Sequence, residues 1–377
     1  MKKVNAAIFY SIVCLLPVVG LALHDFYIVT FEFLAAYLID CILTYIVVML
    51  ILTRKKDEIT EYFRKTELKP LTIFIIAIAS CVVIFAFQQR VPGYLNNITR
   101  ELLLKEYEIS RALNLSLGLV LVAFIYSILS SVLKTRFKLV VLVVFTISLL
   151  VTMSRSEILK VLFVYVTYLI YIHQVSNKVL FKVMIYCIIT GITFGGLLTI
   201  FQGRSENIQE AAWYIIDTFL RYRTFPLLLS EYSVELVRKN PEHILFPFFG
   251  FIIERFLSII SEIPGAVSVQ GSTFVSEFRS LGRGGIYTGN VLYPWWSWFF
   301  GLAGYAGLFL KAIYIYVVLE FVRRMKLYMT FVFLVTHFLF WSPTIHPFLN
   351  NDAMYSLLAF VIFDIINKRR LSFKVAS

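Results

Sequence analysis

The sequence predicts an all-α, polytopic integral membrane protein with about 10 transmembrane helices and a long polar loop that contains amphipathic or re-entrant helices. Of its 377 residues, 59% are hydrophobic, and the mean hydropathy is +0.81. Apolar runs long enough to cross a bilayer as a helix, about 20 residues each, recur along the chain. Between residues 202 and 288 the chain carries eight Arg or Lys and nine Asp or Glu residues. We therefore expect a single membrane domain, residues 1–377, that carries residues 202–288 as a loop.

The apolar runs place the expected helices to within a few residues. These runs cover residues 5–23, 27–52, 70–87, 115–133, 139–153, 157–173, 182–201, 289–320, 327–341 and 352–367. The first run resembles a signal peptide, with Gly20, Leu21 and Ala22 as a weak cleavage pattern. We expect a retained helix instead, because the run is long for a signal and the next run follows almost at once.

Lys and Arg residues predict the orientation of the chain. They gather in both tails and in the loops after every second expected helix, as at Arg54, Lys134 and Arg323. Short basic loops stay on the cytoplasmic side of a membrane. We expect both termini there and the loop 202–288 on the opposite side. The net charge of +12 lies in these short clusters, which argues against a nucleic-acid partner.

The first part of the long loop predicts a helix along the membrane surface. Within residues 211–236, the side chains of Trp213, Ile216 and Leu220 share one helical face, and charged residues occupy other positions. This pattern is typical of an amphipathic helix at a bilayer interface.

Residues 244–263 have the length of a further span. Glu254 and Arg255 at the middle, together with Pro247 and Gly250, make a simple crossing costly. We expect this stretch to lie in the interface or to dip back into the protein. A single extra crossing is the alternative, and it would place the basic C-terminal tail outside.

Motifs of soluble enzymes are missing from the sequence, which has no Walker phosphate loop, GxGxxG, HExxH, paired CxxC or Asp-x-Asp. The histidines are too dispersed to predict a metal site. The cysteines lie inside apolar runs, where they pack as small hydrophobic residues. We therefore expect neither a metal nor a cofactor.

Arginines beside the expected spans give the strongest functional signal. They are Arg155, Arg204, Arg221, Arg223, Arg279 and Arg283. A guanidinium group binds phosphate oxygens through two hydrogen bonds and keeps its charge near lipid, so the group favours a ligand with a pyrophosphate. For any single arginine, the alternative is that it reaches the lipid headgroups or pairs with an acid such as Glu206.

Glycines surround Arg283 and Tyr287 just before an expected span that begins near Asn290. They are Gly282, Gly284, Gly285 and Gly289. Glycines let a ligand approach main-chain N–H groups closely, and they also serve simply as turn residues. Both interpretations remain open from the sequence.

Acidic residues and histidines supply candidates for proton transfer. Glu32 and Asp40 are the deepest acids and lie eight residues apart on roughly one helical face. Intramembrane carboxylates favour a functional role, with a hydrogen bond to a neighbouring helix as the alternative. The candidates for an exposed general base are His346, Glu206 and the His24–Asp25 pair.

Small and aromatic residues in the run 289–320 predict packing. Glycines every three residues predict close helix contact, at Gly301, Gly304 and Gly307. Three indoles predict an aromatic belt at the membrane surface, with a sugar-stacking platform as the alternative, at Trp295, Trp296 and Trp298.

Three features together resemble the O-antigen polymerase family, the oligosaccharide repeat-unit polymerases. SRSEIL begins a span in mid-chain, FQGRSEN begins the long loop, and YTGNVLYPWWSWFFGLAGYAGLFLKAIYIYVVLEFVRR leads into the last spans. The resemblance covers residues 150–324 and the overall number of spans. An Arg followed eleven positions later by Gly, present in some members, does not occur at the arginines named above.

This resemblance implies a metal-independent glycosyltransferase in the bacterial inner membrane. Members of the family take a glycan from undecaprenyl pyrophosphate at the periplasmic face and transfer it onto another lipid-linked repeat unit. The implied partners are the undecaprenyl-pyrophosphate-linked oligosaccharide, the lipid bilayer, a flippase and a polysaccharide chain-length regulator. An O-antigen ligase and a lipid-linked oligosaccharide flippase are the alternative functions.

The resemblance also implies roles for particular residues. Arg204, Arg279 and Arg283 would contact the pyrophosphate and stabilise its departure electrostatically, and His346 would act as the base. Further contacts to the substrate would come from Arg155, Arg221, Arg223, Tyr287 and Asn290.

Overall fold

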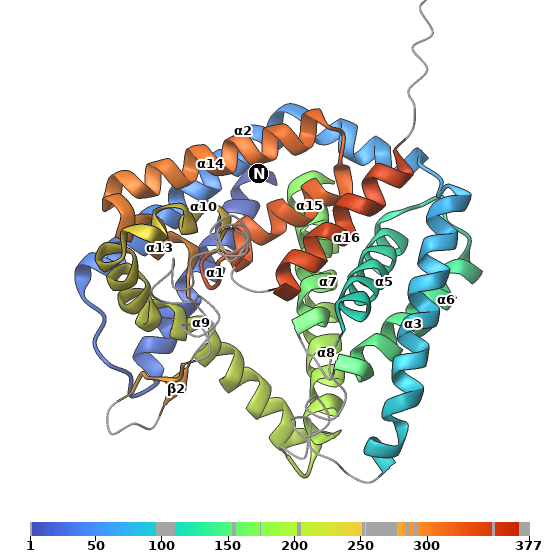
Figure 1. The fold of residues 1–377 in the computed structure, drawn as a ribbon, viewed down its shortest axis with the longest axis horizontal. Coiled ribbons are helices and arrows are strands. Elements are labelled where there is room, and N and C mark those ends of the chain that lie inside the picture. Colours follow the sequence, from blue (N-terminus) through green and yellow to red (C-terminus); the bar gives the residue numbers. More distant parts are fainter. Residues whose placement is uncertain are drawn as a thin grey trace, which may run out of the picture.

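Helices form almost all of the protein that the structure, a computed structural model, describes (Figure 1). The described residues are 2–95, 110–152, 156–173, 175–201, 205–250, 253, 277–282, 287–289, 293–348 and 351–368. Within them, the β-structure consists of the pair β1 (Arg279–Ser280) and β2 (Thr288–Gly289) and an isolated bridge. The prediction of an all-α membrane protein is confirmed at this level.

The first five helices among the described residues follow the predicted apolar runs. They are α1 (Lys2–Leu23), α2 (Phe31–Lys65), α3 (Pro70–Leu95), α5 (Arg111–Leu129) and α6 (Thr135–Thr152). The helix α2 continues beyond its apolar run into a charged segment. There Lys65 donates to Glu61 at 2.6 Å, one turn earlier, which supports the exposed end of the helix.

The middle of the chain contains the long helix of the polar loop. The elements are α7 (Ser156–Thr167), which continues as the π-helix η1 (Tyr168–Ile172), then α8 (Asn177–Phe201), α9 (Ile208–Lys239), the 3₁₀ turn η2 (Pro241–Leu245) and the short α10 (Phe246–Phe249). The side chain of Asn207 accepts from the backbone N–H of Glu210 and so caps α9.

The last part of the chain forms α13 (Trp295–Ala303), α14 (Tyr305–Arg324), α15 (Tyr328–Thr336), the π-helix η4 (His337–Trp341) and α16 (Asn351–Asn367). In α16, the carboxylate of Asp364 accepts hydrogen bonds from the backbone N–H groups of Met329 and Thr330. It therefore satisfies free donors at the beginning of α15.

In the described part, six helices are long and apolar enough to cross a membrane, namely α1, α2, α3, α5, α6 and α14. Large apolar side chains are exposed in stripes along them, for example Ile8, Ile12, Leu15 and Val19 on α1. Such spacing places the side chains on one helical face. Several long apolar helices with exposed apolar stripes indicate a multi-pass membrane protein.

The expected single span 289–320 is wrong, because the chain breaks at Gly304. This residue has φ +57° and ψ −139°, a combination that favours glycine strongly over other residues. A side chain at Gly307 would clash with the carbonyl oxygen of Phe299, and one at Gly301 would meet Val234 of α9 at 3.1 Å. The predicted close packing is thus confirmed at Gly301 and Gly307, and α13 is free to pack on α9.

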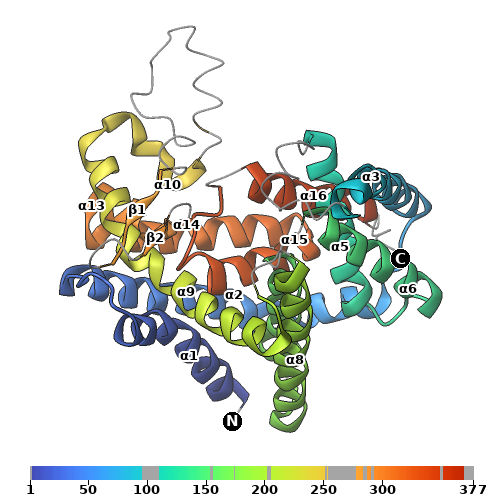
Figure 2. The same ribbon diagram turned by 90° about the horizontal axis from the view of Figure 1, so that it is seen from below.

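The helix α9 packs against other helices of the protein and also lies at its edge. It runs from α8 to α13 and packs on α1 (Figure 2). Near its beginning, Trp213 is 67% exposed, whereas Arg223 at its middle and Leu227 and Ser233 in its second half are buried. The predicted helix is therefore present, but its second half is part of the core and not a surface layer.

The helix ends fall on two sides of the molecule. In Figure 1 the α1–α2 connection and β2 lie at the lower left, and the α8–α9 junction lies at the bottom. The C-terminal ends of α2, α14 and α16 lie at the top and upper right. Lys69 follows α2, and its backbone N–H donates to Asn367 at the end of α16 at 3.0 Å.

Candidate functional site

Arg221 of α9 lies on a charged face near the β-hairpin. Its guanidinium group forms an ion pair with Asp217, one helical turn earlier. Its central carbon lies 5.8 Å from the centre of the Tyr287 ring, within range of a cation–π interaction. The arginine is therefore held in place from two directions.

His24 joins this arrangement from the end of α1. Its Nε2 lies 2.8 Å from Asp217 Oδ1, and its Nδ1 lies 3.0 Å from the carbonyl oxygen of Gly20. Both ring nitrogens of His24 are therefore engaged by oxygen atoms of the protein. We call His24, Asp217, Arg221 and Tyr287 the Arg221 cluster.

The β-hairpin fixes Tyr287 in the cluster. Arg279 pairs with Gly289 in the antiparallel β1–β2 ladder, and the Leu281 N–H donates to the Tyr287 carbonyl at 2.8 Å. A side chain at Gly282 would lie 2.7 Å from the ring of Tyr287. In the described part of the Gly-rich run, glycine thus makes room for a packed aromatic side chain.

Arg279 lies on β1, beside a different part of α9. It forms an ion pair with Glu277, and its guanidinium carbon lies 5.1 Å from the centre of the Tyr232 ring. Its side chain is 25% exposed. Arg279 therefore packs against α9 at Tyr232, about three helical turns along this helix from Arg221.

Arg223 points away from Arg221, because side chains two positions apart in an α-helix differ by about 200° around the helix axis. It is buried, and its Nη1 donates to the Phe340 carbonyl of η4 at 2.6 Å. The rings of Phe163, Phe219 and Trp341 each lie 5.3 Å from its guanidinium carbon. Burial lowers the pKa of Arg223 to about 10. The structure gives this arginine a place in the helical core, separate from the Arg221 cluster.

The expectation that His346 is exposed is wrong. The residue is 0% exposed, its Nε2 faces the carbonyl oxygens of Phe246 at 3.0 Å and Pro247 at 3.2 Å, and its Nδ1 accepts from the Phe348 N–H at 2.9 Å. Burial lowers the pKa of His346 to about 3. With both nitrogens occupied, this imidazole has no free site for the proton of an acceptor hydroxyl.

His346 is one of three side chains that hold α10. The Trp295 indole donates to the carbonyl of Pro247 at 2.7 Å, and the Tyr314 hydroxyl donates to that of Phe248 at 2.8 Å. A four-residue helix leaves such carbonyls without partners of its own. The described beginning of the stretch 244–263, residues 244–250, therefore dips into the protein at Phe246, which is buried, and apart from Ile253 the rest of residues 251–263 lies outside the described residues.

The predicted aromatic belt is also wrong. Trp295, Trp296 and Trp298 are all 0% exposed, so they pack in the interior. The alternative of a sugar-stacking platform requires an accessible ring face and finds no support in this conformation.

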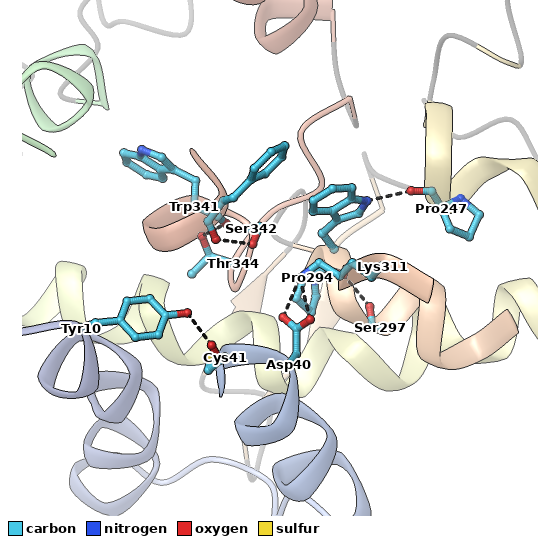
Figure 3. Close-up of polar contacts among 12 residues, drawn as sticks. Tyr10, Asp40, Cys41, Pro247, Pro294, Ser297, Lys311, Trp341, Ser342 and Thr344 are labelled. Carbon is cyan, nitrogen blue, oxygen red and sulfur yellow. Dashed lines mark hydrogen bonds and ion pairs between the residues drawn. The ribbon is translucent and has the colours of Figure 1, made fainter. Parts of the chain in front are cut away.

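Sequence reasoning missed the partner of Asp40. Lys311 of α14 donates to both of its carboxylate oxygens in the interior of the bundle (Figure 3). A lysine within an apolar run was the available signal, because a buried charge requires a partner. Of the other acids, Glu206 and Asp25 are exposed in the described part of the chain.

Four predicted site residues lie outside the described residues, namely Arg155, Arg204, Arg283 and Asn290. Among the residues that are described, no group of three or more His, Cys, Asp or Glu side chains lies close enough to hold a metal ion. Comparison with known proteins found no matching family model, curated protein or solved structure.

Proposed function

We propose that the protein is a membrane glycosyltransferase that polymerises oligosaccharide repeat units linked to undecaprenyl pyrophosphate. The observation that carries this proposal is the Arg221 cluster, in which a partly exposed guanidinium group is held by Asp217 and Tyr287 where two membrane helices connect. Fixed cations at such a place suit a pyrophosphate attached to a lipid.

In this proposal the arginines act on the leaving group. Arg221 contacts the pyrophosphate, and Arg279, Arg204 and Arg283 complete the neutralisation of its charge. Negative charge develops on the pyrophosphate as the bond to the anomeric carbon breaks, so positioned guanidinium groups stabilise the transition state more than the ground state. Tyr287 keeps Arg221 oriented.

A carboxylate takes the role first given to His346. Glu206 and Asp25 are both exposed and can accept a proton. The base removes the proton of the acceptor hydroxyl, the oxygen attacks the anomeric carbon, and the sugar–phosphate bond breaks with its electrons going to undecaprenyl pyrophosphate. Attack from the side opposite the leaving group inverts the anomeric carbon.

The proposed orientation puts this reaction at the periplasmic face of the bacterial inner membrane. The separation of helix ends supports it, because the α1–α2 connection and β2 lie at the lower left, whereas the C-terminal end of α14, with Arg323 and Arg324 in its last turn, lies at the top (Figure 1). Both termini are then cytoplasmic. A flippase that supplies the lipid-linked repeat unit and a chain-length regulator are the proposed partners.

Deletion of the chromosomal copy tests this function. In a strain that makes a smooth lipopolysaccharide, we expect the deletion to leave lipid A core that carries one repeat unit, visible as one band above core on a gel. Bare core would contradict the proposal and would favour an O-antigen ligase or a flippase. A plasmid copy that restores the ladder is the control.

A further inference from the structure

The connection between α1 and α2 carries the most exposed apolar side chains near the Arg221 cluster. Ile28 and Phe31 are each 83% exposed, and Tyr27 is 46% exposed. Because α1 and α2 are both candidate membrane spans, their connection lies where the chain leaves the hydrocarbon of the bilayer. The exposed side chains are thus at the level of lipid headgroups and the first carbons of the chains.

The backbone beneath these side chains is held by the hairpin. Phe26 forms a bridge with Gly282, and the Tyr27 N–H donates to the carbonyl of Leu281 at 3.1 Å. The ring of Phe26 is buried, with its centre 4.7 Å from that of Tyr287. Ile28 and Phe31 therefore project from a backbone that packing and hydrogen bonds fix close to the cluster.

Charge and apolar surface meet at this position. His24, four residues before Ile28, contacts Asp217, and Asp217 also binds Arg221. The side chain of Arg221 is 28% exposed, and a guanidinium group has further N–H groups that can donate to an anion besides Asp217. A ligand that fits both features has an anionic headgroup for the cluster and a hydrocarbon chain for the neighbouring apolar side chains.

We propose that the Arg221 cluster and the α1–α2 connection form the docking surface for the polyprenyl pyrophosphate, which enters sideways from the leaflet. The pyrophosphate binds Arg221, and the first prenyl units lie on Ile28 and Phe31. The inference rests on the proposed function for the identity of the lipid. It adds the route of entry and the residues that hold the chain.

Photocrosslinking tests this docking surface with the full chain. The protein carries a benzophenone amino acid at position 28 and is placed in phosphatidylcholine nanodiscs with undecaprenyl pyrophosphate that bears no sugar. Ile313 on α14, 60% exposed, is the matched control position for contact with bulk lipid. We expect intact mass spectrometry to show an adduct with undecaprenyl pyrophosphate at position 28 and only phosphatidylcholine adducts at position 313.

A second arm asks whether the headgroup directs the contact. In the position-28 protein, Arg221→Gln should reduce the polyprenyl pyrophosphate adduct about tenfold, as expected for loss of one charge-assisted contact. Arg221→Lys, which keeps the charge, should reduce it less, and inorganic pyrophosphate should compete with the lipid. A folded Arg221→Lys protein keeps the test valid if the Gln variant does not fold.

Equal polyprenyl adducts at positions 28 and 313, or an adduct at position 28 that neither Arg221 variant changes, would show bulk lipid contact only and overturn the inference. Because the probe lipid carries no sugar, its binding is measured without polymerisation. The two results are thus independent. A deletion result that contradicts the polymerase function does not exclude the docking surface, and one that supports the function does not establish it.

Discussion

The ammonium group of Lys311 in α14 donates to both carboxylate oxygens of Asp40 in α2, at 2.7 and 2.6 Å. The side chains are 0% and 2% exposed, so the pair is removed from water. The Lys311 nitrogen also lies 5.0 Å from the centre of the Trp295 ring, and that indole donates to Pro247 of α10. This contact therefore joins two candidate membrane spans to the segment that dips into the protein.

Breaking the Asp40–Lys311 pair should strongly destabilise the protein. Asp40→Asn or Lys311→Met leaves one buried partner without its counter-charge, which costs about 3–5 kcal/mol in comparable buried pairs. The double variant Asp40→Leu, Lys311→Met removes both charges and should recover most of the loss. Thermal unfolding in detergent measures the three proteins. If the double variant were as unstable as the sum of the single variants, the pair would not be the coupled unit described here.

Gly304 should tolerate alanine poorly although space is available. Within the part of the chain that the structure describes, and apart from its two chain neighbours, no atom lies within 4 Å of an added Cβ, so the expected loss of about 1–3 kcal/mol comes from the backbone conformation. Gly191→Ala in α8 is the matched control, because its nearest contact is an ordinary 3.7 Å and alanine favours a helix. Equal unfolding temperatures for the two variants would contradict the break between α13 and α14.

His346 should make stability fall in mild acid. Its pKa is about 3 in the folded protein against 6.5 in the unfolded chain, so the unfolded state binds more protons between these values. The stability held by neutral His346 is complete above pH 6.5 and falls by about 1.4 kcal/mol per pH unit below it. In His346→Gln this contribution should vanish. We expect the difference in unfolding free energy between the two proteins to shrink from pH 7.5 to pH 5, and a constant difference would exclude a buried neutral imidazole.

Substitutions of Arg221 and Arg223 should have different effects. Replacing Arg221 should impair polymerisation, and replacing Arg223 should lower the stability of the fold. Arg221 forms a partly exposed ion pair, so Arg221→Gln should change the unfolding free energy by at most about 1 kcal/mol while it shortens or abolishes the polymer. Arg223 donates to the Phe340 carbonyl in the core, so Arg223→Gln should lower stability by several kcal/mol. Lipopolysaccharide gels and unfolding curves of the same variants distinguish the two. An unchanged ladder with Arg221→Gln would remove Arg221 from the proposed site.

The helices were predictable because bilayer length and apolarity are local properties of the sequence. The break at Gly304 was not, since a glycine within an apolar run fits either tight packing or a positive φ. The helical period alone predicts that Arg221 and Arg223 lie on different faces of α9. The Arg221–Asp217 pair follows the i, i+4 rule and was equally readable.

Contacts between residues far apart in the sequence could not be predicted from local sequence patterns. Asp40 and Lys311 are 271 residues apart, and His24 and Asp217 are 193 apart. His346 lies between two prolines in a polar loop, which suggested exposure, but α10 covers it. The three indoles were assigned to a membrane surface by composition, and the turn at Gly304 instead places them in the core.

The most direct test of the proposed function is reconstitution. The purified full chain is placed in vesicles with undecaprenyl-pyrophosphate-linked repeat units as the only glycan, in the absence of nucleotide sugars. We expect lipid-linked dimers and longer chains, with release of undecaprenyl pyrophosphate in equal amount, and loss of these products in Arg221→Gln. If the repeat unit were never extended, or moved only when lipid A core was added, the protein would not be the polymerase proposed here.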